Sequence, residues 1–153
     1  MRMISALEVA KMFIKWGADN GDSITNLKMQ KLLYYAQAWH LVNFGKRLFF
    51  DPIEAWEFGP VVSNVYHSFK KHGYDSLPIP KSVSNIEERL KKGQLKYLKE
   101  LFLIFNDFSA TALVSMTHSE SPWKDNFKKG YNNEIPVPEL KSFYTKMYDK
   151  QNG

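Results

Sequence analysis

The feature that most constrains this chain is the stretch 26–44, which is apolar on nearly every side of the helix it would form. Its large side chains divide among three faces: Leu33, Tyr34 and Leu41; Tyr35, Trp39 and Val42; Leu32 and Ala36. A helix that is apolar all round is usually buried all round. Thr25 before it and Gly45 after it are typical helix ends. The stretch therefore predicts the central helix of the fold.

Polar side chains accompany this helix into the interior. Gln30, Gln37, His40 and the tyrosine hydroxyls lie within the same stretch. A buried polar group without a partner costs about 1–3 kcal/mol. We therefore expect each of them to bind a neighbouring element.

Further helices are predicted on both sides of the central one. Ser5 and Glu8 form an S-x-x-E capping box at the start of a helix that Gly17 ends. Ser63 is expected to cap a third helix, and apolar residues recur at helical spacing over 94–108, 110–119 and from Pro138 onward. The sequence predicts a mainly α fold, α+β at most. We expect one compact domain, residues 1–153, built as a helical bundle around the buried helix.

A small β-hairpin is the expected exception to the helices. Residues 48–50 and 53–56 have strand composition, with Asp51-Pro52 as the turn between them. Gly59-Pro60 is expected to break the chain after the second strand. Residues 124–137 carry no clear pattern and are expected to be irregular.

Composition narrows the function. The chain has no cysteine, so disulfides, thiolate metal sites and cysteine nucleophiles are excluded. No apolar run approaches the roughly 20 residues that span a bilayer, and the N-terminus lacks a signal-peptide pattern, so a cytoplasmic protein is expected. The net charge is +5, but the lysines occur in scattered pairs rather than one tract, which disfavours nucleic acid as the partner.

The sequence offers one candidate for acid–base chemistry. His118 and Glu120 could act as a base and its orienting group. No nucleophile elbow, phosphate-binding loop or paired histidines accompany them. The alternative is a helix end whose side chains cap backbone groups while Trp123 fills the core. We expect no enzyme activity, no metal and no cofactor.

The aromatic residues leave two interpretations open. Tyr34, Tyr35, Trp39, Trp56 and Phe58 could form a base-stacking platform, but their helical and strand spacing favours core packing. Tyrosine and tryptophan near a surface are also typical of hot spots between proteins.

Three segments together resemble the Panacea domain, the SocA-like antitoxin domain also found in GepA-type phage-associated proteins. They are residues 25–37, residues 52–62 with Tyr66, and residues 113–123, where Thr117-His118-Ser119-Glu120 precedes Pro122-Trp123. The resemblance extends from about Leu7 to the last helix. Met29 and Phe58 replace the leucine and tyrosine common in the family, and both changes preserve bulk.

The resemblance implies an antitoxin of a bacterial or prophage toxin–antitoxin system that neutralises a toxin protein by direct binding. Toxins of such pairs include small alarmone-synthetase-like enzymes, and one branch delivers its toxin to a cytosolic protease. A nucleic-acid-binding phage regulator is the alternative from another class. The expected toxin-binding residues are Trp56, Glu57, Phe58, Tyr66, His118, Glu120 and Trp123.

Overall fold

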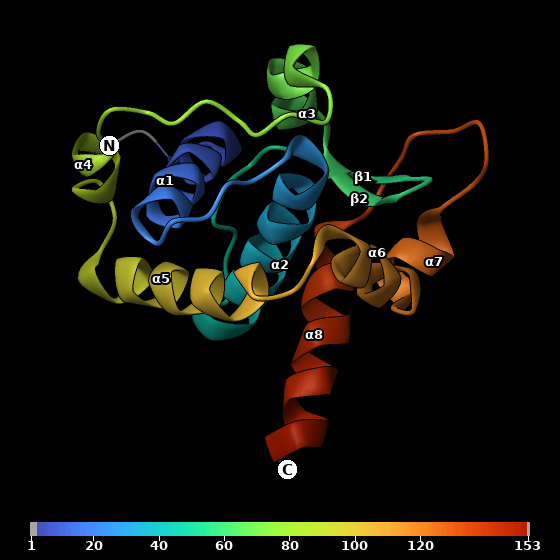
Figure 1. Ribbon diagram of the computed structural model, residues 1–153. Coiled ribbons are helices and arrows are strands. Elements are labelled where there is room, and N and C mark those ends of the chain that lie inside the picture. The colour runs from blue at the N-terminus through green and yellow to red at the C-terminus, as the bar shows by residue number, and fades with distance from the viewer. Residues whose placement is uncertain (1–2, 153) are drawn as a thin grey trace.

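A computed structural model describes residues 3–152 and places helix α2 (Asn26–Phe44) in the middle of the molecule (Figure 1). Helices α1, α3, α5, α6 and α8 and strand β2 all contact it. The remaining bounds are α1 Ala6–Asp19, β1 Ile53–Trp56, β2 Gly59–Val62, α3 Ser63–Phe69, the 3₁₀ turn η1 Lys70–His72, α4 Ser84–Glu87, α5 Lys92–Asn106, α6 Ala110–His118, α7 Ser121–Asn126, β3 Asn133–Glu134 and α8 Val137–Asn152. The prediction of a mainly α fold with a small β part is confirmed.

The central helix has the ends and the burial that its sequence predicts. The Thr25 hydroxyl accepts a hydrogen bond from the Lys28 amide, and Gly45 takes the left-handed conformation at the other end. Residues on all sides are buried. No single apolar stripe could place this helix, so its position is fixed by neighbours on every side.

The polar groups of α2 hold the segments on either side of it. The Gln37 amide donates to the Phe49 carbonyl at 2.7 Å and accepts from the Leu48 amide at 2.7 Å. His40 Nδ1 lies 2.7 Å from the Lys46 carbonyl, and its Nε2 receives the Gln94 amide at 3.1 Å. The expectation that these side chains find internal partners is confirmed.

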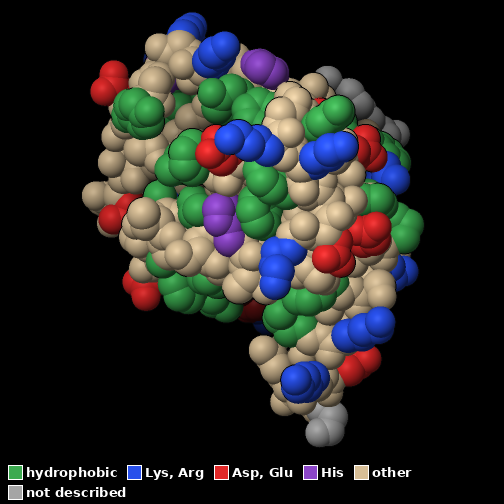
Figure 2. Space-filling model, turned by 90° about the vertical axis from the view of Figure 1, so that its right-hand side faces the viewer, with side chains coloured by type: hydrophobic (Ala, Val, Ile, Leu, Met, Phe, Trp, Pro, Cys, Tyr) green, Lys and Arg blue, Asp and Glu red, His purple; other side chains and the backbone are tan. Residues whose placement is uncertain are grey.

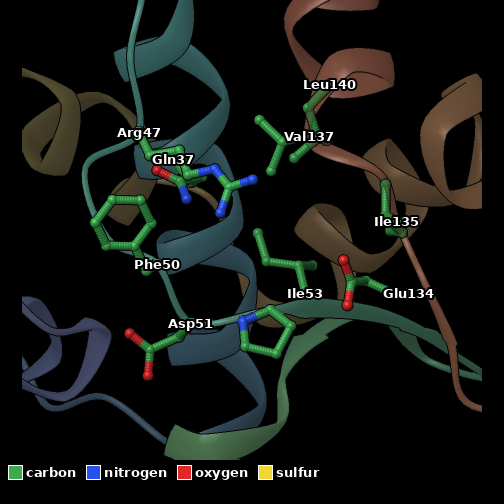
Figure 3. A pocket seen from close by; sticks show the side chains of 10 residues that line it. Gln37, Arg47, Phe50, Asp51, Ile53, Glu134, Ile135, Val137 and Leu140 are labelled. Atoms are coloured by element: carbon green, nitrogen blue, oxygen red, sulfur yellow. The ribbon is translucent and has the colours of Figure 1, made fainter.

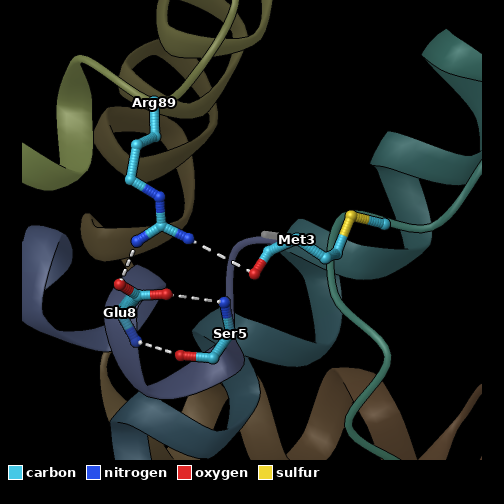
Figure 4. Close-up of polar contacts among 4 residues, drawn as sticks. All are labelled: Met3, Ser5, Glu8 and Arg89. Carbon is cyan, nitrogen blue, oxygen red and sulfur yellow. Dashed lines mark hydrogen bonds and ion pairs between the residues drawn. The ribbon is translucent and has the colours of Figure 1, made fainter. Parts of the chain in front are cut away.

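The N-terminal capping box is present and has a third member (Figure 4). The Ser5 hydroxyl accepts from the Glu8 amide at 3.1 Å, and the Glu8 carboxylate accepts from the Ser5 amide at 3.0 Å. Arg89 pairs with the same carboxylate and also donates to the Met3 carbonyl. The cap therefore also ties α1 to the segment between α4 and α5.

Gly17 does not end α1, as the sequence analysis expected, because the helix continues to Asp19. A Cβ atom at Gly17 would lie 3.2 Å from Ile24 Cδ1 and 3.4 Å from the Phe102 ring. Phe102 itself stacks on Phe13 at 5.1 Å. Gly17 is thus a packing residue that lets α1 lie close to its neighbours.

The predicted strand 53–56 is confirmed as β1, but its predicted partner and the predicted turn at Asp51-Pro52 are wrong. Residues 48–50 form no strand, and β1 pairs instead with β2, which begins at Gly59 and contains Pro60. Gly59-Pro60 is therefore part of a strand rather than a break. Strand β3, within the segment expected to be irregular, pairs with the other edge of β1 and gives the order β2-β1-β3.

Two helix starts also differ from the sequence analysis. Val62 rather than Ser63 occupies the N-cap of α3, and no side chain caps it, because the strand leads directly into the helix. Residues 121–126 form the separate short helix α7, with Pro122 in its first turn. Helix α7 and the loop that follows extend beside the hairpin in Figure 1.

Candidate functional site

A groove of about 1130 Å³ lies at the tip of the hairpin. We call it the hairpin groove. Five parts of the chain line it: the first turns of α2, the hairpin, α3 with the turn that follows it, the first residue of α6, and the loop after α7. Its lining residues are Thr25, Asn26, Leu27, Gln30, Lys31, Trp56, Glu57, Phe58, Val61, Tyr66, Lys70, Gly73, Tyr74, Ala110, Phe127, Lys129, Gly130, Tyr131 and Asn132.

The hairpin is fixed to α2 along its outer edge. Trp56 pairs with Gly59, and Glu57 and Phe58 form the turn between them. On the edge of β2 that faces α2, the side-chain Oε1 of Gln30 accepts from the Val62 amide at 2.9 Å, and Lys31 Nζ donates to the Pro60 carbonyl at 3.0 Å. Pro60 stands where its missing N–H is not needed by β1. Two side chains of α2 thus occupy the open edge of the sheet.

Gly59 allows this close contact. Its φ is +107°, and a Cβ atom there would lie 2.8 Å from Lys31 Cε and 2.8 Å from Thr117 Oγ1. A side chain would therefore meet both strained backbone and occupied space. Helices α2 and α6 reach the hairpin together at this point.

Lys31 is a buried amine whose ammonium group lacks an acidic partner among residues 3–152. Burial lowers its pKa from 10.5 to about 7, because the interior disfavours the charged form. Its one observed hydrogen bond, to the Pro60 carbonyl, is available to the charged and the neutral amine alike. Lys31 therefore holds the hairpin against α2, and the free-energy cost of burying its amine depends on pH.

Aromatic side chains stand on three walls of the groove with much of their surface exposed. Phe58 is 64% exposed, Tyr74 is 95% exposed and Tyr131 is 56% exposed. Trp56 and Tyr66 lie behind them, with ring centroids 4.8 Å apart and an edge-to-face arrangement. Exposed aromatics gathered in one groove are typical of a protein-binding surface.

The groove is also basic. Lys70 and Lys129 line it together with Lys31, and Glu57 is the one acidic residue in its lining. The hairpin tip and the loop after α7 extend to the right in Figure 1. The face seen from that side shows exposed hydrophobic side chains among both basic and acidic ones (Figure 2).

His118 and Trp123 support the hairpin from behind the groove. Their rings stack at 3.9 Å, and Trp123 stacks in turn on Phe127 at 4.8 Å. Trp123 Nε1 donates to the Trp56 carbonyl at 2.7 Å. Partial burial lowers the pKa of His118, and a hydrogen bond with the Glu57 backbone opposes that shift. These two side chains position the hairpin tip.

Glu120 points to a different place, the interior between α2 and α8. Its carboxylate accepts from the Tyr35 hydroxyl at 2.6 Å and from the Tyr144 hydroxyl at 2.9 Å, while Tyr144 lies 2.9 Å from the Tyr34 hydroxyl. We call these four residues the tyrosine cluster. Burial raises the pKa of Glu120, and the two tyrosine donors oppose the rise.

The structure divides the seven residues expected to bind the toxin into two groups. Trp56, Glu57, Phe58 and Tyr66 line the groove. His118, Glu120 and Trp123 are outside its lining and take internal partners. His118 and Glu120 therefore serve different parts of the fold, and the structure does not arrange them as a base with its orienting group.

Sequence reasoning missed the other walls of the groove. Lys129 and Tyr131 lie in the segment expected to be irregular, and Tyr74 lies in a segment for which no helix or strand was predicted. The available signal was a tyrosine directly after a glycine, as in Gly73-Tyr74 and Gly130-Tyr131. Large aromatics at turns have few neighbours to bury them, but that pattern does not say that the two turns meet.

A second cavity, of about 280 Å³, lies where the loop after α2 meets β3 and α8 (Figure 3). Arg47 crosses its opening, and Ile53, Val137 and Leu140 form its apolar side. This volume falls below the usual range for ligand pockets, about 300–1,000 Å³. No group of three or more His, Cys, Asp or Glu side chains within residues 3–152 could hold a metal. No described helix is both long and apolar enough to cross a membrane.

Comparisons with known proteins agree on one family. The family described as "Antitoxin SocA-like, Panacea domain" matches residues 29–124. Antitoxin SocA of Caulobacter vibrioides (strain NA1000 / CB15N) is 32% identical over 137 residues, a match that covers 78% of this chain and 69% of that relative. No solved structure matches the chain. The matched range contains α2 from Met29 onward, the hairpin and α3, whereas Lys129 and Tyr131 lie beyond it.

Proposed function

Because the chain belongs to the SocA-like antitoxin family with the Panacea domain, we propose that it neutralises a partner toxin protein by binding it directly in the hairpin groove. The observation that carries the proposal is the set of exposed aromatics, Phe58, Tyr74 and Tyr131, on the walls of one groove. Such side chains supply most of the binding energy of protein interfaces when a partner buries them.

The groove is held in place before any partner arrives. Lys31 and Gln30 fix one strand of the hairpin, and Trp123 fixes the end of the other through the Trp56 carbonyl. A preformed surface loses little conformational entropy on binding. Occupation of a toxin's active surface needs no chemistry from this chain, and the internal roles of His118 and Glu120 are consistent with that mode of action.

Co-expression tests the proposal. The candidate toxin is the product of the neighbouring reading frame, expressed in a host alone and with this chain. Growth arrest alone and growth with this chain are the expected results, together with co-purification of the two proteins. A toxic neighbour that this chain neither binds nor neutralises would contradict the proposal, as would a harmless neighbour with no co-purifying partner.

A pair of substitutions then tests the surface. Phe58→Ala with Tyr74→Ala should abolish neutralisation, because both side chains are exposed and their loss removes partner contacts rather than core. Leu103→Ala with Ile104→Ala is the matched control, since each of these α5 side chains is 61% exposed and lies outside the groove. If the α5 pair abolished neutralisation and the groove pair did not, the toxin would bind elsewhere.

The toxin's abundance separates direct blockade from delivery to a protease. Under blockade, immunoblots should show an unchanged amount of toxin while growth recovers. A steep, protease-dependent fall in the toxin would show that neutralisation occurs by delivery instead.

A further inference from the structure

The charges of the hairpin groove are unbalanced. Lys31, Lys70 and Lys129 line it against the single acid Glu57. The ion pairs found among residues 3–152 involve Lys15, Lys99 and Arg89, and none of the groove lysines. Nearby, Lys128 Nζ lies 4.5 Å from the centre of the Tyr131 ring, which adds positive charge to the same wall.

Two walls of the groove each carry a cation and an aromatic side chain. Lys70 and Tyr74 belong to the wall at the end of α3, and Lys129 and Tyr131 belong to the wall formed by the loop after α7. Glu57 and Phe58 form the hairpin turn, which is a third part of the lining. A complementary partner would present carboxylates at the walls and apolar side chains between them.

Resting on the function proposed above, we propose that the occupant of the hairpin groove is an acidic, apolar segment of the toxin. Its carboxylates pair with Lys70 and Lys129, and its aromatic or aliphatic side chains pack among Phe58, Tyr74 and Tyr131. The groove volume of about 1130 Å³ exceeds that of a usual small-molecule pocket and accommodates a stretch of polypeptide.

The segment binds through side chains rather than as an added strand. The outer edge of β2 is already occupied, because Gln30 holds the Val62 amide and Lys31 holds the Pro60 carbonyl. Strand addition needs free backbone donors and acceptors along such an edge. Specificity therefore depends on which apolar and acidic side chains the toxin presents.

A nucleic acid is the less suitable occupant of this groove. Proteins that bind DNA through its backbone commonly make about 6–10 phosphate contacts. The groove offers Lys70 and Lys129 as exposed cations, while Lys31 is fully buried beneath Pro60. Even with the neighbouring Lys128, so few exposed cations suit a few carboxylates better than a phosphate chain.

Charge reversal tests the inference. The proteins are the full chain, its double variant Lys70→Glu with Lys129→Glu, and the control Lys81→Glu with Lys96→Glu. All four lysines are exposed, and the control pair lies outside the groove with the same change in net charge. Titration calorimetry against the toxin from the co-expression experiment should show affinity reduced roughly tenfold or more for the groove pair and little change for the control. As the salt concentration rises, the affinity of the unaltered chain for the toxin should also fall more steeply than that of the groove variant.

Three results would overturn the inference. One is equal affinity for the groove variant and the unaltered chain, with neutralisation intact; the proposed antitoxin function would then stand while the acidic segment would be wrong. Another is an equal loss of affinity for the toxin in the groove variant and in the control variant. A third is tight, salt-sensitive binding of a single-stranded oligonucleotide that the toxin cannot displace. Restoration of binding by Asp or Glu→Lys changes in the toxin would identify the acidic segment directly.

Discussion

The tyrosine cluster and the hairpin groove use the same kinds of side chain in opposite ways. In the cluster, Tyr34 and Tyr144 are fully buried, and their hydroxyls bind each other while Glu120 accepts from Tyr144. In the groove, Tyr74 and Tyr131 keep most of their rings exposed. Aromatics with all their partners inside the chain stabilise the fold, whereas aromatics without them are free for a second protein.

The cluster joins three parts of the chain that are far apart in sequence. Tyr35 comes from α2, Glu120 from the start of α7 and Tyr144 from α8. The Tyr144 ring meets Tyr35 at 6.2 Å and Trp39 at 5.4 Å. The fold therefore depends on this cluster, while the exposed aromatics of the groove contribute little to it, and substitutions can separate the two roles.

Tyr144→Ala should have the largest effect on stability. It removes a fully buried ring and leaves the Tyr34 hydroxyl and the Glu120 carboxylate with one partner fewer, so the free energy of unfolding should fall by about 4 kcal/mol. Urea denaturation followed by circular dichroism measures the change. Tyr148→Ala on the same helix is the control, because that ring is 47% exposed and its loss should cost less than about 0.5 kcal/mol. Equal losses would mean that the cluster does not organise the fold.

Gly59→Ala should have the next largest effect, about 3 kcal/mol, because strain at positive φ adds to a clash with Lys31 and Thr117. Gly130→Ala measures the backbone strain alone, without a clash. Its φ is +84°, and a Cβ atom there would have no neighbour within 4 Å, so about 1 kcal/mol is expected. Thermal unfolding of both variants gives the difference. Equal costs would show that the hairpin is not tightly packed on α2.

Lys31→Met should change how stability depends on pH. The folded-state pKa of Lys31 is about 7 against 10.5 for the free side chain, so the unfolded chain binds more protons between these values. The stability of the unaltered protein should therefore rise as the pH increases from about 7 to about 9.5, with about 3 kcal/mol of the rise due to Lys31. Lys31→Met should lose that contribution, and the exposed control Lys81→Met should keep it. Parallel pH profiles for all three proteins would contradict the burial of this amine.

The sequence allowed the central helix to be predicted because its signal is local. Apolar residues on every face of 26–44, Thr25 and Gly45 at its ends, and buried amides that needed partners all lie within one stretch. The hairpin was misassigned because residues 48–50 have strand composition but are held by Gln37 rather than by a neighbouring strand. Pro60 also looked like a break in the chain, although it lies in β2 with its backbone nitrogen facing away from β1, where no hydrogen bond to β1 is lost.

The site was predictable only in part for a similar reason. Trp56, Glu57, Phe58 and Tyr66 are close in sequence and reach the same groove. Glu120 and Trp123 belong to the same motif, yet their partners Tyr35, Tyr144 and Trp56 decide that they face inward. Tyr74 and Tyr131 reach the groove through loops 57 residues apart, which no local pattern connects.

The smallest expected change in the free energy of unfolding distinguishes the hairpin groove from the tyrosine cluster most sharply. Phe58→Ala and Tyr74→Ala should each change the free energy of unfolding by less than about 0.5 kcal/mol, because their rings are 64% and 95% exposed and bury little surface within the chain. Urea denaturation of the single variants provides the measurement, with Tyr144→Ala as the destabilised reference. A loss of neutralisation without a loss of stability would establish these rings as binding residues. A loss of about 2 kcal/mol or more would show instead that the groove aromatics support the fold, and the contrast with the tyrosine cluster would disappear.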